Sequence, residues 1–372
     1  MKKFFAILVT LVIALSSATS LAAEKLIEAS GEYVMDSRLD ETPSSATARA
    51  REEAKRAAIE KAGVYLQTYS KMIDLELAED EVRTVAARLL KIQEESNDVK
   101  VIEKNLLKFT VTIKALVDDL DENLLKNIMQ DKQSLEELTR KNKELQEKYD
   151  ELNRQMAKYR GEFDSASDAK KVEIKKEVAR NADKFSAVNE LAKGNDLSFR
   201  KNYVQALEAY DAAIKLDPQL AEAYNNRGIV KYELRNFSEA IEDYTMAITL
   251  NSNHADALNN RGNAYAALEQ FQNALSDLKA SLKLNDKSAA GHNNLGSVYL
   301  FQKIFGSAVN EYTNAIKLNP NFAEAYYNRA MTYYYQANYE KALEDVLKAI
   351  KLNPNDAATK ELYEKIKRQY SR

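Results

Sequence analysis

The chain lacks cysteine and tryptophan, and it has only nine glycines, four prolines and two histidines among its 372 residues. Without cysteine it cannot form a disulfide, a thiolate metal site or a lipid-modified N-terminal cysteine. Few glycines and prolines in a chain rich in Ala, Leu, Glu and Lys favour long helices over many short strands. We therefore expect a mostly α protein of two or more domains that is stabilised by packing alone.

Long hydrophobic runs are also scarce, and the one that stands out lies at the N-terminus. Lys2 and Lys3 precede an apolar run from Phe4 to Leu15, and small residues follow up to Ala23. Because this run is shorter than the ~20 residues that cross a bilayer, it predicts a cleavable secretory signal over residues 1–23. A retained membrane anchor is the alternative. The signal predicts an extracytoplasmic protein, periplasmic in a two-membrane bacterium, with no membrane span in the mature chain.

The chain has no excess of positive charge. It carries 54 Lys and Arg against 57 Asp and Glu, a formal net charge of −3, and losing the two lysines of the signal changes this to −5. A mildly acidic chain argues against nucleic acid as a partner, since binding to phosphates needs clustered basic residues.

Motifs for catalysis and for cofactors are missing too. The chain contains no HExxH, no GxSxG, no glycine-rich phosphate loop and no cysteine nucleophile. We expect His254 and His292 to be structural, and we expect no catalytic residue, metal site or cofactor. Carboxylates are abundant, so an enzyme stays open as the least favoured function.

What the chain does have is an internal repeat with a constant period of about 34 residues. Small residues recur at Gly194, Gly228, Gly262, Gly296 and Ala330, at Ala206, Ala240, Ala274, Ala308 and Ala342, and at Ala213, Ala247, Ser281, Ala315 and Ala349. Ring-bearing residues recur at Tyr203, Phe237, Phe271, Phe305 and Tyr339. Small residues at fixed sites let two helices approach closely while an aromatic ring fills the remaining gap, so each period predicts one antiparallel helix pair.

With segments such as "AEAYNNRG" and "AIKLNP", residues 187–356 resemble the tetratricopeptide repeat family. The resemblance implies an α-solenoid of five helix pairs, and residues 357–372 are typical of the amphipathic helix that caps such a stack. An asparagine follows each of the last four second helices, where we expect a left-handed residue. These asparagines are Asn251, Asn285, Asn319 and Asn353.

An arginine and an aspartate recur together within the repeats. The pairs are Arg227 with Asp243, Arg261 with Asp277, and Arg329 with Asp345. Where the arginine is replaced by Lys193 or Leu295, the aspartate is replaced by Ala209 or Glu311. This pattern predicts a bridge between the two helices of one repeat, the alternative being two separately favoured surface residues.

Asparagines recur on the first helix of the repeats, which in such stacks lines a concave groove. They are Asn226, Asn260, Asn294 and Asn328, preceded by Asn225, Asn259 and Asn293. An asparagine offers a donor and an acceptor, and the resemblance implies that a ladder of them holds an extended peptide by its backbone. The alternative is that these side chains only bridge adjacent repeats or meet water.

Tyrosines add to the groove in the last repeat. Tyr327, Tyr334 and Tyr335 are expected to face it, where exposed tyrosines are common interface anchors. Because tyrosine faces also stack on sugars, a glycan remains an alternative ligand.

The N-terminal residues 24–120 predict a small α+β domain. Residues 26–35 alternate as a strand does, residues 44–64 predict a helix capped near Ser44 or Ser45, and residues 99–118 predict a strand pair. With "AGVYLQTYSK" after the helix and "VTIKALVD" at the end, this segment resembles the small N-terminal domain of flagellar assembly protein T and related envelope lipoproteins. No catalytic motif comes with that resemblance.

Residues 121–163 predict a coiled-coil helix and residues 164–186 a helical spacer. The heptad series are Ile128, Leu135, Asn142, Tyr149 and Met156, and Leu138, Leu145, Leu152 and Tyr159. Such a seam predicts a homodimer through residues 124–160, with a helix folded back on its own chain as the alternative.

Together these features predict an exported scaffold or adaptor of the cell envelope that binds a protein or an extended peptide in the groove. A polysaccharide-binding accessory of an export or secretion machine is the alternative.

Overall fold

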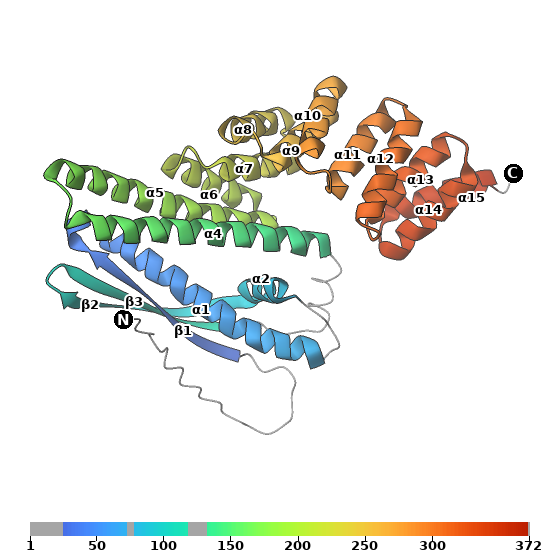
Figure 1. Cartoon of the computed structure of the whole chain (residues 1–372). Helices are drawn as coiled ribbons and strands as arrows, with labels where there is room; N and C mark the ends of the chain where they lie inside the picture. Colours follow the sequence, from blue (N-terminus) through green and yellow to red (C-terminus); the bar gives the residue numbers. More distant parts are fainter. Residues whose placement is uncertain (1–24, 73–77, 118–131, 371–372) are drawn as a thin grey trace. The chain divides into compact units, whose positions relative to one another are not determined.

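The computed structural model describes residues 25–72, 78–117 and 132–370. The predicted signal and Ile128 lie outside the described residues. The chain divides into two compact units, residues 1–182 (unit 1) and 183–372 (unit 2). Unit 1 contains a three-stranded antiparallel sheet with helices, and unit 2 contains an array of helix pairs (Figure 1). The predicted fold class, a mostly α chain with a small α+β domain before a repeat solenoid, is confirmed.

Unit 1 begins with strand β1 and a long helix, and the rest of the sheet follows later in the chain. Its elements are β1 (Lys25–Asp36), the 3₁₀ turn η1 (Ser37–Leu39), α1 (Pro43–Met72), α2 (Glu79–Leu89), β2 (Leu90–Glu103), β3 (Leu106–Val117), α4 (Lys132–Phe163) and the start of α5 (Asp168–Phe199). The strand order is β1-β3-β2, and both pairings are antiparallel.

The start of α1 differs from the expected cap. The hydroxyl of Thr42 accepts a hydrogen bond from the backbone N–H of Ser45 at 3.2 Å, so the capping residue is Thr42 rather than Ser44 or Ser45. Pro43 explains the shift, because its fixed φ and missing N–H suit the first position of a helix. Helix α2 was not predicted, and β2 begins at Leu90, well before the expected strand pair.

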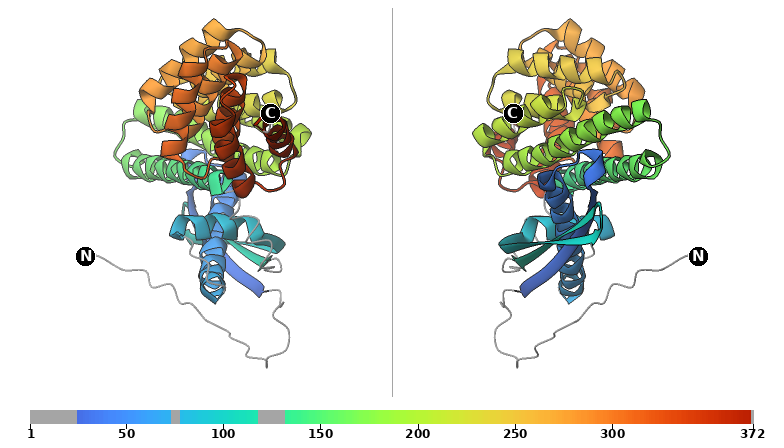
Figure 2. Two further views of the ribbon diagram at one scale, coloured as in Figure 1. Left: turned by 90° about the vertical axis from the view of Figure 1, so that its right-hand side faces the viewer. Right: turned by 90° about the vertical axis from the view of Figure 1, so that its left-hand side faces the viewer.

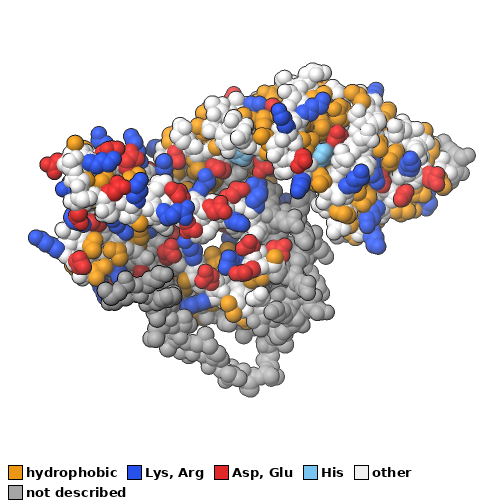
Figure 3. Space-filling model, viewed as in Figure 1, with side chains coloured by type: hydrophobic (Ala, Val, Ile, Leu, Met, Phe, Trp, Pro, Cys, Tyr) orange, Lys and Arg blue, Asp and Glu red, His pale blue; other side chains and the backbone are white. Residues whose placement is uncertain are grey.

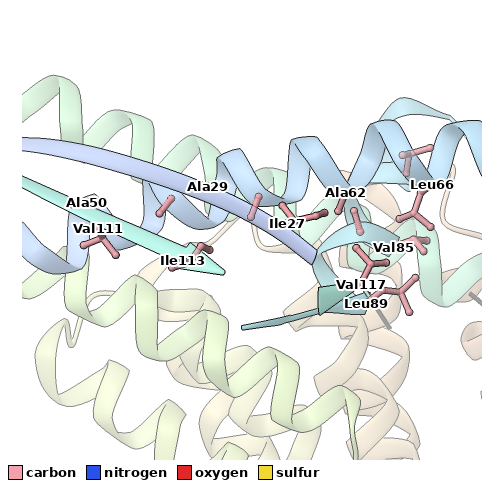
Figure 4. Close-up of a cluster of buried hydrophobic side chains, with 14 of the residues drawn as sticks. Ile27, Ala29, Ala50, Ala62, Leu66, Val85, Leu89, Val111, Ile113 and Val117 are labelled. Carbon is pink, nitrogen blue, oxygen red and sulfur yellow. The ribbon is translucent and has the colours of Figure 1, made fainter. Parts of the chain in front are cut away.

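The core of unit 1 lies between one face of the sheet and α1 (Figure 4). Inward-facing residues alternate along β3, and α1 presents an alanine at every fourth position. These fully buried alanines are Ala46, Ala50, Ala54, Ala58 and Ala62. They bring α1 so close to β1 that a Cβ on Gly31 would collide with the backbone of Ala50 and Ala54. The small residues therefore set the spacing between helix and sheet.

The opposite face of the sheet carries polar side chains. Ser30 and Thr112 share a hydrogen bond of 2.8 Å, and Lys114 Nζ lies 2.7 Å from Glu94 Oε2. Lys108 Nζ lies 2.7 Å from Glu32 Oε1. Helix α1 covers one face of the sheet (Figure 2), and no described helix packs on the other face.

The heptad helix folds back onto its own chain. Of the seam residues whose side chains the structure describes, Leu145, Tyr149, Leu152 and Met156 are buried within unit 1, and Asn142 and Tyr159 are half-buried. Met156 packs with Leu39, Ile174 and Val178, the last two from α5. This is the second of the two alternatives for the seam, and the predicted homodimer through residues 124–160 is not supported because the chain itself covers the seam. The rest of the surface of α4 and α5 carries interspersed acidic and basic side chains (Figure 3).

A buried charged cluster ties α1 to α4 and α5. The two terminal nitrogens of Arg49 each donate a hydrogen bond of 2.6 Å, one to Asn153 and one to Asn181. Glu41 lies 3.8 Å from Arg49 Nε and 3.3 Å from Arg160 Nη2. Burial raises the pKa of the Glu41 carboxyl above its usual value.

Unit 2 continues α5 into a regular array of helix pairs. Its other helices are α6 (Tyr203–Leu216), α7 (Ala221–Glu233), α8 (Phe237–Leu250), α9 (Ala255–Ala267), α10 (Phe271–Leu284), α11 (Ala289–Phe301), α12 (Phe305–Leu318), α13 (Ala323–Tyr335), α14 (Tyr339–Leu352) and α15 (Ala357–Tyr370). The end of α5 pairs with α6 as repeat 1, and α7 to α14 form repeats 2 to 5. Leu362 and Ile366 of α15 pack on α13 and α14, so α15 caps the stack as expected.

Within a repeat, the small residue of the first helix lies against a large residue of the second. A Cβ on Gly228 would lie 2.7 Å from the ring of Tyr244, and Gly296 meets Tyr312 in the same way. The predicted role of these glycines in helix approach is confirmed.

The left-handed residues lie in other turns than we expected. Asn251 has a φ of −137°, and the three equivalent asparagines have φ values of −141°, −132° and −133°. The Asn251 side chain instead accepts a hydrogen bond from the backbone N–H of Asn253 at 3.1 Å, a local turn that needs no positive φ. Positive φ values occur in the turns inside the repeats, at one equivalent position in each: Lys201, Arg235, Glu269, Lys303 and Ala337.

Candidate functional site: the first-helix face

The first helices α7, α9, α11 and α13 lie in a row, and their asparagines join them. We call the surface of these four helices the first-helix face. In each contact, a side-chain amide N–H donates to the oxygen of an asparagine in the preceding repeat. The bonds run from Asn226 to Asn195 (2.9 Å), Asn260 to Asn225 (3.1 Å), Asn294 to Asn259 (3.1 Å) and Asn328 to Asn293 (3.0 Å). The ladder therefore bridges adjacent repeats, which was the alternative to a ligand-binding role.

Part of the hydrogen-bonding capacity of the ladder is used inside the protein. The amide of Asn225 donates to Asn226 Oδ1 at 3.1 Å, and that of Asn293 donates to Glu324 Oε1 at 3.1 Å. Both residues are buried.

The middle of the first-helix face keeps unused polar atoms. Among the residues described by the structure, nothing accepts from Asn259 Nδ2 and nothing donates to Asn260 Oδ1 or Asn294 Oδ1. All three side chains are only half-buried, whereas Asn226 and Asn328 at the ends of the ladder are buried. One donor and two acceptors from α9 and α11 are thus left for a ligand or for water.

The three predicted groove tyrosines differ in exposure. Tyr335 is 58% exposed, and its ring stacks on Phe305 with centroids 6.3 Å apart. Tyr327 and Tyr334 are half-buried in the apolar cluster that α15 closes, and Tyr334 also contacts Tyr339. Tyr335 is therefore the one of the three that presents most of its ring.

The predicted bridges between arginine and aspartate are present and bidentate. Arg227 donates to both oxygens of Asp243 at 2.9 and 2.6 Å, and Arg261 and Arg329 hold Asp277 and Asp345 in the same way. The hydrogen bond to Asp243 raises the pKa of Arg227 above its usual value. The prediction of a bridge within the repeat is confirmed.

Each of these arginines also reaches the preceding repeat, which we did not predict from the sequence. The remaining guanidinium nitrogen donates to Asp211 from Arg227 (2.6 Å), to Thr245 from Arg261 (3.1 Å) and to Thr313 from Arg329 (2.9 Å). We call each arginine with its two acceptors a clamp. The sequence does contain a pattern that indicates this contact, because the acceptor lies as many residues before each arginine as the aspartate lies after it. Where Leu295 replaces the arginine, that preceding position is Lys279.

The two histidines make contacts within unit 2. His254 Nδ1 accepts from the backbone N–H of Ala257 at 3.4 Å, and His292 Nδ1 lies 2.7 Å from Glu311 Oε2. The described ranges contain no group of His, Cys, Asp and Glu side chains that could hold a metal ion. Nor do they contain a helix with the length and hydrophobicity to cross a membrane.

The antiparallel pairs of unit 2, stacked at a constant period and closed by a cap, define an α-solenoid of the helix-pair class. Family models for the tetratricopeptide repeat match residues 221–254, 255–288 and 323–356, and a model for the TPR repeat matches residues 194–235 and 305–336. Unit 2 is a stack of tetratricopeptide repeats. Such repeats are interaction modules for other proteins, so this unit has the fold of a protein interaction scaffold.

The chain also resembles several solved structures over about half of its length. YrrB, a TPR protein with an unusual peptide-binding site, is 28% identical over 48% of this chain and 92% of its own, with a TM-score of 0.39. PilF of Pseudomonas aeruginosa is 21% identical over 50% of this chain and 85% of its own, with a TM-score of 0.46. MamA of Desulfovibrio magneticus RS-1 is 17% identical over 46% and 97%, with a TM-score of 0.41. Among curated proteins, none matches the chain.

Proposed function

We propose that this protein is an exported adaptor of the cell envelope that holds an extended segment of a partner protein on its first-helix face. The observation that supports a peptide ligand is the set of unused amide atoms of Asn259, Asn260 and Asn294 on α9 and α11. An extended peptide backbone offers N–H and C=O groups in alternation, which match one donor and two acceptors without regard to side chains.

The ladder decides which variant tests this proposal. Replacing all the asparagines by alanine would also remove the bonds between repeats, so a loss of binding would be ambiguous. Asn259→Asp avoids this problem, because an aspartate keeps the oxygen that accepts from Asn294 and removes the unused N–H donor. Asn321→Asp is the matched control, since it adds the same charge at an exposed turn between repeats.

The measurement is binding of the purified protein and both variants to an array of extended peptides, followed by titration of the peptides that bind. We expect Asn259→Asp to weaken binding by about 2- to 12-fold, the value of one lost hydrogen bond, and Asn321→Asp to have no effect. Peptides that bind wild type and Asn259→Asp equally well would overturn the use of the first-helix face.

A glycan is the second candidate ligand, and the exposed ring of Tyr335 favours it. Tyr335→Ala separates the two ligands. Glycan binding that disappears in Tyr335→Ala and survives in Asn259→Asp would replace the adaptor by a polysaccharide-binding accessory.

The export part of the proposal has its own support in the apolar run from Phe4 to Leu15 behind two lysines. We would fuse residues 1–30 to alkaline phosphatase, which is active only outside the cytoplasm of bacteria. An active fusion and a mature N-terminus near Glu24 are the expected results. An inactive fusion would exclude export while leaving peptide binding untouched.

A further inference from the structure

Strand β2 is an open edge of the sheet in unit 1. It pairs with β3 on one side, and within the described residues no strand pairs with its other side (Figure 1). Residues 91–103 are all exposed, including four large apolar side chains: Ile92, Val99, Val101 and Ile102. A long edge strand of this kind presents a row of unpaired backbone N–H and C=O groups to which another strand can bind.

The regular part of β2 is short and bounded on both sides. Its pairing with β3 shifts register between Ile92 and Glu94 and again between Val101 and Glu103. Residues 94–101 therefore form one uninterrupted ladder between two irregularities, which limit how far a new strand can pair.

On the polar face of the sheet, the side chains of this ladder match a second copy of themselves. In an antiparallel pair of identical strands centred on Asn97, Glu94 lies opposite Lys100 and Ser96 lies opposite Asp98, each contact occurring twice. All four of these residues belong to the polar face of the sheet, since β3 pairs them with Lys114, Lys108, Thr112 and Thr110. Opposite charges directly across a strand pair stabilise it, and a serine hydroxyl can donate to a carboxylate.

Neighbouring registers lack this match. When two identical strands pair about a two-fold axis, their register can change only in steps that leave each side chain on the same face of the sheet. Centring the pair on Ser96 places Glu94 opposite Asp98, and centring it on Asp98 places the two Asp98 side chains opposite each other. Both shifts put like charges in contact. Centring the pair on Val99 places Asp98 opposite Lys100, but only residues 97–101 of the ladder would then pair. The register centred on Asn97 pairs residues 94–100 and is the favoured one.

We propose that β2 pairs with β2 of a second copy of this chain, antiparallel and centred on Asn97, so that two three-stranded sheets join into one. Because this contact is narrow, it forms a weak dimer at micromolar concentrations. The first-helix face plays no part in it, so the dimer and peptide binding can fail independently.

The absence of cysteine gives a clean test. In the mature protein, Asn97→Cys introduces one thiol that would face its own copy. Directly opposite residues have Cα atoms about 5 Å apart, within the range that a disulfide bridges. Lys100→Cys is the matched control, because its two copies would lie about 20 Å apart along the strand.

We expect mild oxidation to cross-link Asn97→Cys and to leave Lys100→Cys monomeric on a non-reducing gel. Light scattering on the wild-type mature protein should show a mass that rises towards the dimer between about 1 and 100 µM. Lys100→Glu, which places a second carboxylate opposite Glu94 in both contacts, should raise the dissociation constant about tenfold.

A wild-type protein that stays monomeric over this range would overturn the proposal, as would equal cross-linking of the two cysteine variants. A monomer that gains mass only with a foreign protein would assign the edge to a different partner and would overturn it too. Circular dichroism would establish that each variant is folded.

Discussion

Both units rely on a glycine to bring two elements close together, but the atoms that face the glycine differ. In unit 1, a Cβ on Gly31 would meet the backbone of α1 at Ala50 and Ala54. In unit 2, a Cβ on Gly228 would meet the ring of Tyr244, a side chain that can shift. Backbone in a packed helix cannot shift without moving the helix. In unit 1 the approach of α1 to β1 therefore depends on one glycine that faces backbone, whereas in unit 2 the same requirement is spread over several glycines that face side chains.

The largest expected effect is that of Gly31→Ala. The added methyl group should separate α1 from β1 along the whole alanine stripe and cost about 3 kcal/mol or more of the free energy of unfolding. Urea denaturation followed by circular dichroism would measure this loss. If Gly31→Ala unfolds at the wild-type urea concentration, α1 and β1 do not make the contact described, and the contrast between the units disappears.

A smaller effect is expected for Gly228→Ala, at about 1–3 kcal/mol. Repeat 5 has both changes at the equivalent positions. Ala330 takes the place of the glycine, and the smaller Val346 takes the place of Tyr244. We therefore expect Gly228→Ala with Tyr244→Val to be more stable than the sum of the two single changes implies. Strict additivity in thermal unfolding would show that the ring is not what the glycine accommodates.

The smallest effect, and the one of opposite sign, is expected for Gly161→Ala in α4. Apart from its own stretch of α4, nothing described lies within 4 Å of the position that its Cβ would take. Alanine restricts the unfolded chain and suits a helix, so this change should stabilise the protein by about 0.5–1 kcal/mol. A loss of stability would mean that Gly161 has a packing partner after all.

The same contrast explains how much of the fold the sequence predicts. The repeats are visible because their contacts recur at a constant period, so that Gly228, Ala240 and Arg227 identify their roles by repetition. Unit 1 offers no repetition. The contact of Gly31 with α1 joins segments distant in sequence, and Thr42 is followed by two serines, a residue type that caps helices more often than threonine does. Strand β2 was placed too late because charged residues such as Glu94 and Asp98 weaken its alternating pattern.

The asparagines of the first-helix face could be picked out from the sequence, but their use could not. An asparagine can bind a ligand, a neighbour or both, and spacing alone cannot separate these uses. The structure separates them atom by atom: Asn260 Nδ2 serves the ladder and Asn260 Oδ1 does not. Tyr327 and Tyr335 likewise share one helix and one residue type, but packing in the cluster with α15 half-buries the first, whereas the second stays exposed.

The clamps have one gap. Arginines fasten repeat 2 to repeat 1, repeat 3 to repeat 2, and repeat 5 to repeat 4, but Leu295 stands where repeat 4 would need its arginine. Leu295 packs instead with Ala274 and Leu278 of repeat 3 in an apolar contact. Apolar surfaces slide more easily than a guanidinium held at three atoms. We expect the stack to flex most at this junction between α10 and α11, where no clamp holds the two repeats. The side chains of Asn259 and Asn294 are hydrogen-bonded to each other across it, and each keeps one unused atom there, Asn259 Nδ2 and Asn294 Oδ1.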